Sequence, residues 1–265
     1  MAGNGTFFSV VVSTHLRPVL LRRALQSLRD QSFRDFETIV VADAWDQESA
    51  AAAAQLLGAQ DSFIKRRGEP GPAASRNLGM SMARGEWLLF LDDDDRFLPQ
   101  HLQAVHAQAR NPEAQVLFTN CEVVIEDRAR PGMPAASTEK FDLLTQDVQG
   151  LWVKNFIPNN ALAYRRSALD GCQFDTHLAS LEDWDFLLGV CTRALPTPCP
   201  GGGVAVHKDG VPGNSRNSRK EALGSTLVLD VLHIYRRWPA PDDDLQSERQ
   251  EYLAELGMRV PLEWL

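Results

Sequence analysis

The sequence has no apolar run of about 20 residues, the length that a membrane-spanning helix needs, so no transmembrane segment is expected. Its first residues, MAGNGTFFSVVVS, carry no basic residue before the apolar run and make a poor signal peptide. Cysteine is scarce, and no two cysteines form a C-x-x-C pair, which predicts reduced thiols: Cys121, Cys172, Cys191 and Cys199. We therefore expect a cytoplasmic protein, with contact at the inner face of the membrane as an alternative.

Positive charge is also in deficit, with 27 Lys and Arg against 35 Asp and Glu, for a net charge of −8. That balance argues against a general affinity for nucleic acid. Hydrophobic residues make up 44% of the chain and charged residues 23%, so the chain is expected to fold around a sizeable core. A length of 265 residues suits one large α/β domain or one domain with an appendage.

Strand and helix patterns alternate four times in the first 110 residues. Apolar, β-branched runs predict buried strands at 7–13, 36–42, 62–66 and 86–91, and helical patterns follow them at 17–31, 47–58, 73–85 and 99–110. This alternation predicts a Rossmann-like, mostly parallel open sheet flanked by helices, with ligands outside the carboxyl ends of the strands.

The pattern is less regular after residue 110. We expect a bent strand or a hairpin at 114–127, a loop at 128–138, a helix at 182–195, a strand at 201–207 and a long amphipathic helix at 224–238. The simplest division is a catalytic domain at 1–220, with halves at about 1–120 and 121–220, and a helical extension at 221–265. The amphipathic helix suits packing on the core, on a second copy of the chain or on a membrane.

Four consecutive aspartates, Asp92 to Asp95, follow the fourth predicted strand. Carboxylates this close raise one another's pKa unless a cation neutralises them. Mg²⁺ or Mn²⁺ is often held by one or two carboxylates and keeps other positions for substrate phosphates. Asp92 and Asp94 would share one side of an extended strand end. The alternative is a helix N-cap, which Asp95 could supply.

Three stretches taken together carry a family resemblance: SVVVSTHLRPVLLRRALQSLRDQSFRDFETIVVADA, then ASRNLGMSMARGEWLLFLDDDDRFLP, then LEDWDFLLG. They resemble the family 2 glycosyltransferases of the GT-A fold over roughly residues 7 to 210. The resemblance implies a GT-A fold, a nucleotide-sugar donor, a divalent metal and inversion at the anomeric carbon. It also implies that Asp92, Asp93 and Asp94 lie at the metal and the donor ribose.

Asp43 ends the second predicted strand, where the family usually has an aspartate that accepts a hydrogen bond from the nucleotide base. The family often has two aspartates followed by Gly-Ser, whereas this chain has Asp43 between Ala42 and Ala44, so the base stays open. The alternative is that Asp43 has only a structural role, as a turn-forming aspartate. Further donor contacts are expected after the first strand, from Thr14, His15 and Arg17, although His15 alone could be a solvated loop residue.

The SRNLG stretch at 75–79 lies early in a predicted helix. Arg76 can bind a phosphate or a carboxylate in a bidentate manner, and Asn77 can bond to the ribose region. In the family this stretch lines the donor pocket. Gly79 would allow close packing of the helix on a strand. The alternative is a surface arginine and a packing glycine.

Glu182 and Asp183 precede a helical apolar pattern. On their own they could be an acidic first turn that the helix dipole favours. The resemblance implies that Asp183 is the general base, which takes the proton of the acceptor hydroxyl, and that Glu182 orients Asp183 or the acceptor.

The basic segment at 204–219 offers a third metal ligand, His207, because imidazole can bind Mn²⁺. Arg216 and Arg219 could close over the diphosphate when the donor binds. The alternative is a solvated loop.

The region at 155–184 lies between the donor half and the base and is expected to bind the acceptor, a saccharide or lipid-linked saccharide. Candidates are hydrogen-bonding amides, arginines for an anionic group and stacking aromatics: Asn159, Asn160, Arg165, Arg166, Trp152 and Trp184. Aromatic residues here could equally belong to the core. A homodimer through the C-terminal helix and peripheral contact with a membrane are further candidates.

Two other functions fit parts of the pattern. A nucleotidyltransferase also uses metal-bound carboxylates, but the STHLRPV stretch after the first strand has no glycine for a phosphate loop. A catalytically silent sugar-nucleotide binding module would not need its acidic residues, and these are intact. The favoured hypothesis is an inverting, metal-dependent glycosyltransferase that uses a UDP-, GDP- or dTDP-sugar, in bacterial polysaccharide or glycolipid synthesis.

Overall fold

The structure is a computed structural model that describes residues 6–210 and 224–265. One mixed sheet runs through the molecule in the order β3-β2-β1-β4-β8-β6-β9-β5, and β7 pairs with β6. The strands are β1 (Phe8–Thr14), β2 (Phe36–Ala42), β3 (Ser62–Lys65), β4 (Trp87–Asp92), β5 (Arg96–Phe97), β6 (Val116–Glu126), β7 (Ala135–Phe141), β8 (Leu162–Arg165) and β9 (Thr197–Asp209). The helices are α1 (Pro18–Arg29), α2 (Gln47–Leu56), α3 (Pro72–Met82), α4 (His101–Ala109), α5 (Glu182–Cys191), α7 (Gly224–Arg237) and α8 (Asp243–Glu255).

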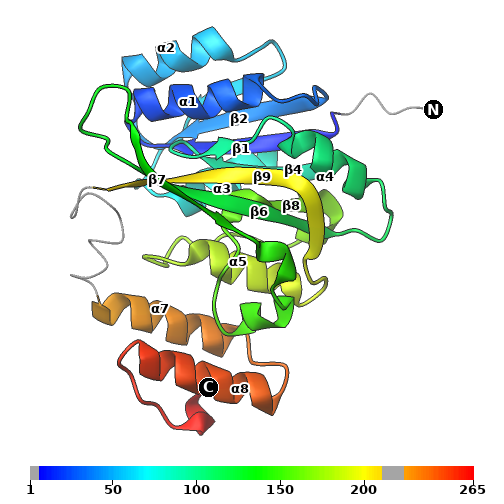
Figure 1. Cartoon of the computed structure of the whole chain (residues 1–265), viewed down its shortest axis with the longest axis vertical. Coiled ribbons are helices and arrows are strands. Elements are labelled where there is room, and N and C mark those ends of the chain that lie inside the picture. Colours follow the sequence, from blue (N-terminus) through cyan, green and yellow to red (C-terminus); the bar gives the residue numbers. More distant parts are fainter. Residues whose placement is uncertain (1–5, 211–223) are drawn as a thin grey trace.

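The first four strands, β1 to β4, confirm the predicted alternation. They pair in parallel, and every residue of β1 and β2 is buried, as expected of strands covered on both faces. The chain moves outward from β1 to β3 through α1 and α2 and returns to β4 through α3. Because such crossovers are right-handed, α3 lies on the face opposite to α1 and α2 (Figure 1). Gly79 of α3 permits close packing, since a Cβ there would lie 2.3 Å from a methyl carbon of Val11.

The second half of the sheet is mixed. β8 runs antiparallel to both β4 and β6, and β6 runs parallel to β9. β8 was not predicted, because its run of four residues is too short to show a period. The predicted segment 114–127 forms one continuous strand, β6, and not a hairpin of its own. β6 pairs instead with β7, so the predicted loop ends earlier, at residue 134.

The helices of the C-terminal part stack on one side of the sheet. α5 covers the sheet on the face of α3, and α7 and α8 lie successively farther from the sheet beyond α5 (Figure 1). The buried Arg249 of α8 joins these layers by donating hydrogen bonds to the carbonyls of Trp152, Tyr235 and Trp238. In the described parts of the chain, no helix combines the length and apolarity that crossing a bilayer requires.

Candidate functional site

The carboxyl ends of β1, β2 and β4 meet at one edge of the sheet and bring three predicted site segments together. In the sheet register, Thr14 lies beside Ala42, the residue before Asp43, and Ser13 lies beside Asp92. Ser13 Oγ also donates to Asp92 Oδ1 at 3.3 Å. This edge is where open parallel sheets place their ligands.

The four aspartates after β4 alternate between two environments. The chain turns directly after the strand, and the Asp95 N–H donates to the Asp92 carbonyl at 3.0 Å. Asp93 and Asp95 are buried, whereas the side chains of Asp92 and Asp94 are 35% and 22% exposed. Asp92 and Asp94 thus share the accessible side, as predicted, although a turn and not an extended strand end puts them there.

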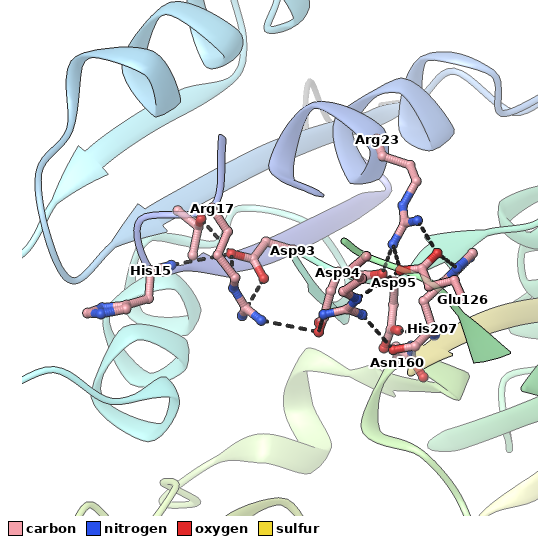
Figure 2. A network of polar contacts seen from close by, with 11 residues as sticks. His15, Arg17, Arg23, Asp93, Asp94, Asp95, Glu126, Asn160 and His207 are labelled. Atoms are coloured by element: carbon pink, nitrogen blue, oxygen red, sulfur yellow. Dashed lines mark hydrogen bonds and ion pairs between the residues drawn. The ribbon is translucent and has the colours of Figure 1, made fainter. Parts of the chain in front are cut away.

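Asp93 is held inside the protein by the segment that follows β1 (Figure 2). Thr14 Oγ1 donates to Asp93 Oδ2 at 2.7 Å, and Arg17 Nη2 lies 2.5 Å from Asp93 Oδ1. The His15 backbone N–H donates to the same carboxylate at 3.3 Å. Burial raises the pKa of Asp93 to about 6, and the Arg17 charge limits that rise.

Asp95 joins distant parts of the chain instead of capping a helix. Its Oδ1 accepts from the His207 N–H and its Oδ2 accepts from Asn160 Nδ2, both at 2.7 Å. Burial raises the pKa of Asp95 well above its usual range, and the neighbouring Asp94 adds to the rise. The predicted cap role is wrong, because α4 has Gln100 at its N-cap.

Asp92 and Asp94 are the carboxylates suited to a divalent cation. Arg17 and Arg128 contact Asp94 Oδ2 at 3.1 and 3.2 Å, so two guanidinium groups share the space around it. Figure 2 shows the contact with Arg17. Among the residues that the structure describes, no three His, Cys, Asp or Glu side chains are grouped to hold an ion on their own. A hard cation needs only one or two carboxylates where substrate phosphates complete its shell, so this pair fits such an ion together with a diphosphate.

His207, the predicted third ligand, has protein partners at both ring nitrogens. Its Nδ1 lies 2.9 Å from Glu126 Oε2, and its Nε2 accepts from Arg96 Nε at 2.9 Å. Burial lowers the pKa of His207 to about 4, so the ring is neutral at pH 7. The predicted ligand role is not supported, because neither nitrogen has a lone pair directed to a metal site.

A charged cluster around the buried Glu126 was missed by the sequence reasoning. Arg23 of α1 donates to Glu126 Oε2 at 2.6 Å, and Arg128 donates to Glu126 Oε1 at 2.9 Å. Arg23 also donates to the Asp94 carbonyl at 2.6 Å, so the cluster fixes the turn after β4 (Figure 2). No sequence signal could have found it, since Arg23 lies 71 and 103 residues from these two partners.

Asp43 connects two loops at the end of β2. His15 Nδ1 lies 2.6 Å from Asp43 Oδ1, and the Gly71 N–H donates to Asp43 Oδ2 at 2.8 Å. Each carboxylate oxygen keeps a second lone pair for a ligand. His15 is about half exposed, with its side chain 48% accessible, and Trp45 nearby in sequence is 52% exposed.

Arg76 links the two halves of the site. Its Nη2 lies 2.7 Å from Asp92 Oδ1, and its Nη1 lies 2.7 Å from Glu182 Oε1. Burial alone would lower the pKa of Arg76, but the charges of Asp92 and Glu182 outweigh burial and raise it. The guanidinium therefore stays charged and ties the turn after β4 to the first turn of α5.

Asn77 has a structural role that was not predicted. Its Nδ2 donates to the Phe174 carbonyl and its Oδ1 accepts from the Phe174 N–H, both at 2.8 Å. This pairing uses one N–H and one oxygen lone pair of the amide, and a second N–H and a second lone pair remain, so a contact with the donor stays a prediction. Arg76 binds Glu182 and Asn77 binds the backbone of Phe174, so the two residues hold both ends of the segment 174–182.

Asp183 lies in the first turn of α5 beside Glu182. Its Oδ1 accepts a hydrogen bond from the Trp184 N–H at 2.8 Å. Burial and the neighbouring Glu182 raise the pKa of Asp183 to about 6, and the Arg76 charge limits that rise. A carboxylate with this pKa is suited to accept a proton near neutral pH.

Asn159 and Asn160 lie in the short 3-10 helix Asn159–Ala161, next to the site. Both are buried, and Asn160 reaches Asp95. Among the described residues, neither side-chain Oδ1 has a hydrogen-bond partner. A buried acceptor without a donor is unusual and is consistent with a ligand hydroxyl.

The remaining predicted acceptor residues are buried in the core or lie at the far end of the sheet. Trp184 is buried and its Nε1 donates to the Leu151 carbonyl at 2.8 Å, so the prediction of sugar stacking is wrong and the core alternative is correct. Trp152 is also buried. Arg165 pairs with Trp87 in the sheet, at the opposite end of β4 from the aspartates, and Arg166 lies next to it. Arg216 and Arg219, which were predicted to close over the diphosphate, lie outside the described residues.

Comparison with protein families gives a match over most of this region. The model described as Glycosyl transferase family 2 matches residues 9–172. An uncharacterized glycosyltransferase of Haemophilus influenzae is 31% identical over 197 residues, which cover 72% of this chain and 64% of that protein. The GalNAc(5)-diNAcBac-PP-undecaprenol beta-1,3-glucosyltransferase of Campylobacter jejuni is 33% identical over 136 residues, or 50% of this chain and 43% of that protein. The chain thus spans less than two thirds of the length of these relatives.

Solved structures show the same fold at low sequence identity. Residues 1–349 of S. aureus TarS in complex with UDP-GlcNAc superpose with a TM-score of 0.68 at 21% identity, over 93% of this chain and 71% of that one. The mannosyltransferase PcManGT of Pyrobaculum calidifontis, in complex with GDP-Man and Mn²⁺, gives a TM-score of 0.66 at 17% identity, over 97% and 71%. The predicted GT-A fold class is confirmed, with a mixed sheet where a mostly parallel one was expected.

Proposed function

Since this chain belongs to glycosyl transferase family 2, we propose that it transfers a sugar from a nucleoside diphosphate sugar to an acceptor hydroxyl, with inversion at the anomeric carbon. The observation that carries the proposal is the buried Arg76, which joins the accessible Asp92 to Glu182, the neighbour of Asp183. This contact brings the proposed cation ligand Asp92 and the segment of the proposed base together at one edge of the sheet, which supports the proposal.

Asp183 is the proposed general base. Its unprotonated carboxylate takes the proton of the acceptor hydroxyl while that oxygen attacks the anomeric carbon. The pKa of Asp183, raised to about 6 by burial, leaves the group mostly unprotonated at pH 7 and still basic enough to bind a proton. Glu182, held by Arg76, keeps the first turn of α5 in place.

Asp92 and Asp94 are the proposed ligands of Mn²⁺ or Mg²⁺. When bound, the ion neutralises the charge that develops on the departing diphosphate. Arg17 and Arg128 already neutralise part of this carboxylate cluster, so diphosphate oxygens can take over their guanidinium groups when a donor arrives. A cation among the carboxylates would favour this exchange.

The donor nucleotide is proposed to lie over β1 and β2, against His15, Asp43 and Asp92. Thr14 and Asp93, which were predicted donor contacts, are buried and bonded to each other, so they would support this surface and not touch the donor. The Asp43 side chain orients the His15 ring at 2.6 Å and retains lone pairs for the base or the ribose. UDP-, GDP- and dTDP-sugars are the candidate donors. UDP-GlcNAc and GDP-Man occur in two proteins of the same fold.

The acceptor is proposed to be a saccharide or a lipid-linked saccharide. The buried Oδ1 atoms of Asn159 and Asn160, which lack donors among the described residues, suit sugar hydroxyls. The Campylobacter jejuni relative is named for an undecaprenol-linked saccharide, which supports a lipid-linked acceptor and therefore contact with a membrane. The same assignment suits a role in polysaccharide or glycolipid synthesis.

The first test is a panel of UDP-, GDP- and dTDP-sugars screened for thermal stabilisation with Mn²⁺ and with EDTA. We expect one nucleotide series to raise the melting temperature only when Mn²⁺ is present. The same donors are then tested for slow hydrolysis. Release of nucleoside diphosphate supports the transferase, release of pyrophosphate supports a nucleotidyltransferase, and no release supports a silent binding module.

Asp183→Asn tests the base. We expect this variant to lose transfer and hydrolysis while its stabilisation by donor and Mn²⁺ is kept. Asp244→Asn, a change at an exposed aspartate of α8, is the matched control and should behave like the unmodified protein. Turnover retained in Asp183→Asn would remove Asp183 from the role.

A further inference from the structure

The segment that carries Glu182 and Asp183 enters α5 in an unfavourable backbone conformation. Leu181, the residue before the helix, has φ 62° and ψ 19° and offers no side-chain cap. A left-handed conformation is unfavourable by about 1–2 kcal/mol for a residue with a side chain. It persists only where the surroundings hold it, and such residues cluster at functional sites.

The C-terminal helix α7 holds the chain directly before that point. Asp230 Oδ2 accepts hydrogen bonds from the Ser180 N–H at 2.9 Å and from Ser180 Oγ at 2.8 Å. Asp230 is 9% exposed, so water competes little for these bonds. One carboxylate of α7 thus fixes the backbone three residues before Asp183.

The same end of the chain also holds α5 directly after Asp183. The buried Asp185 accepts from Trp238 Nε1 at 2.8 Å and from Arg237 Nη1 at 3.0 Å. Farther along α5, Gly189 leaves room for the Trp238 ring, since a Cβ there would lie 3.1 Å from it. Asp183 therefore stands between two anchors that both come from α7 and the residue after it.

We infer that α7 helps to form the catalytic site by holding the segment that carries Asp183, and that Asp230 is a positioning residue for this general base. The inference rests on the proposed function, in which Asp183 is that base. Asp230 holds Ser180, the held Ser180 keeps Leu181 in its left-handed conformation, and Leu181 directs the first turn of α5 toward Arg76 and Asp92. Without the two bonds from Ser180 to Asp230, Leu181 leaves its left-handed conformation and Asp183 moves away from its position in the site.

The central experiment compares Asp230→Ala with Asp230→Asn. Alanine removes both bonds to Ser180, whereas the asparagine Oδ1 can still accept them. Leu229→Ala is the matched control, because Leu229 is the neighbouring residue of α7 and is 59% exposed. Turnover is measured as UDP released from UDP-GlcNAc with Mn²⁺, or as GDP released from GDP-mannose if no UDP is released.

We expect Asp230→Ala to lower kcat by about 10- to 100-fold with the donor KM within twofold, because a misplacement of about 1 Å can reduce a rate by 100-fold. Asp230→Asn should recover most of the rate, and Leu229→Ala should match the unmodified protein. A kcat within twofold in Asp230→Ala, or a loss that appears in donor KM alone, would overturn the inference. If Asp230→Ala does not fold, Ser180→Ala removes one of the two bonds and takes its place.

Amide hydrogen exchange separates failure of this inference from failure of the proposed function. We expect faster exchange at residues 180–186 in Asp230→Ala and not in Asp230→Asn. If the unmodified protein releases no nucleoside diphosphate from any sugar of the UDP-, GDP- and dTDP-panel but exchange still rises in Asp230→Ala, the proposed function fails and the positioning of residues 180–186 by Asp230 stands. If exchange at residues 180–186 is unchanged in Asp230→Ala, Asp230 does not hold this segment, and the inference is overturned even if the variant loses activity.

Discussion

Replacing Arg76 by glutamine tests the link between the halves of the site. Arg76 is buried and makes contacts of 2.7 Å with two carboxylates, one on Asp92 and one on Glu182. The Glu182 side chain is 12% exposed, so losing that charged hydrogen bond should destabilise the fold by about 2 kcal/mol. The Asp92 side chain is 35% exposed and water can replace its partner, which limits its contribution to about 1 kcal/mol.

The expected loss is therefore about 3 kcal/mol, which corresponds to a fall in melting temperature of roughly 6–12 °C for a chain of this size. The loss should depend on pH in a definite direction. The Arg76 charge lowers the pKa of Asp183, which burial holds at about 6, so removing Arg76 raises that pKa further. A raised carboxyl pKa in the folded state means stability that is present at low pH and lost as pH rises. The difference should be largest at pH 8 and smaller at pH 5.

Melting curves of Arg76→Gln and the unmodified protein at pH 5 and pH 8, without metal, measure both effects. Arg22→Gln is the control, since Arg22 is an exposed arginine of α1 that bonds only to Gln55 among the described residues. It should shift stability by less than about 0.5 kcal/mol. A fall of under 2 °C in Arg76→Gln at pH 8, or a difference that grows toward pH 5, would refute the reasoning.

Three further predictions follow from single contacts. The kcat of the unmodified protein should rise with pH through an apparent pKa near 6, because Asp183 must be unprotonated; a rate independent of pH from 5 to 8 would contradict this. Gly79→Ala should lower stability in urea by about 1–3 kcal/mol, because the added Cβ would lie 2.3 Å from Val11, and Val11→Ala in the same chain should restore part of the loss. Arg249→Leu should destabilise the protein by about 3 kcal/mol, because it leaves buried carbonyls without a donor, and limited proteolysis should then cut first near α8; an unchanged digestion pattern would argue against it.

The first half of the fold could be read from the sequence because its strands are covered on both faces. Such strands appear as mostly apolar runs, such as 39–42 and 87–91, and their crossover helices carry a clear helical period. The second half contains β8, four residues long, whose partners β4 and β6 are set by tertiary structure alone. A single sequence holds no signal for that pairing.

The site divides in a similar way. Local chemistry predicted that Asp92 and Asp94 alternate with Asp93 and that a helix begins at Glu182. Asp92 and Asp94 are indeed partly exposed on either side of the buried Asp93, and α5 begins at Glu182. Partners at long range could not be predicted, among them Asp230 with Ser180 and Asn77 with Phe174. Trp184 is a different case, since Trp184, Leu187, Leu188 and Cys191 form one apolar face at helical spacing, and that period already favoured the core.

The place of β4 in the middle of the sheet affects how the chain folds as it is made. One edge of β4 pairs with β1, which precedes it, but the other pairs with β8, which begins at Leu162, 70 residues after β4 ends at Asp92. At synthesis rates of about 5–20 residues per second, roughly 4–14 s pass between the synthesis of β4 and the synthesis of its second partner, β8. During that interval the nascent protein presents an apolar, unpaired strand, and chaperone binding to it would protect the chain from aggregation.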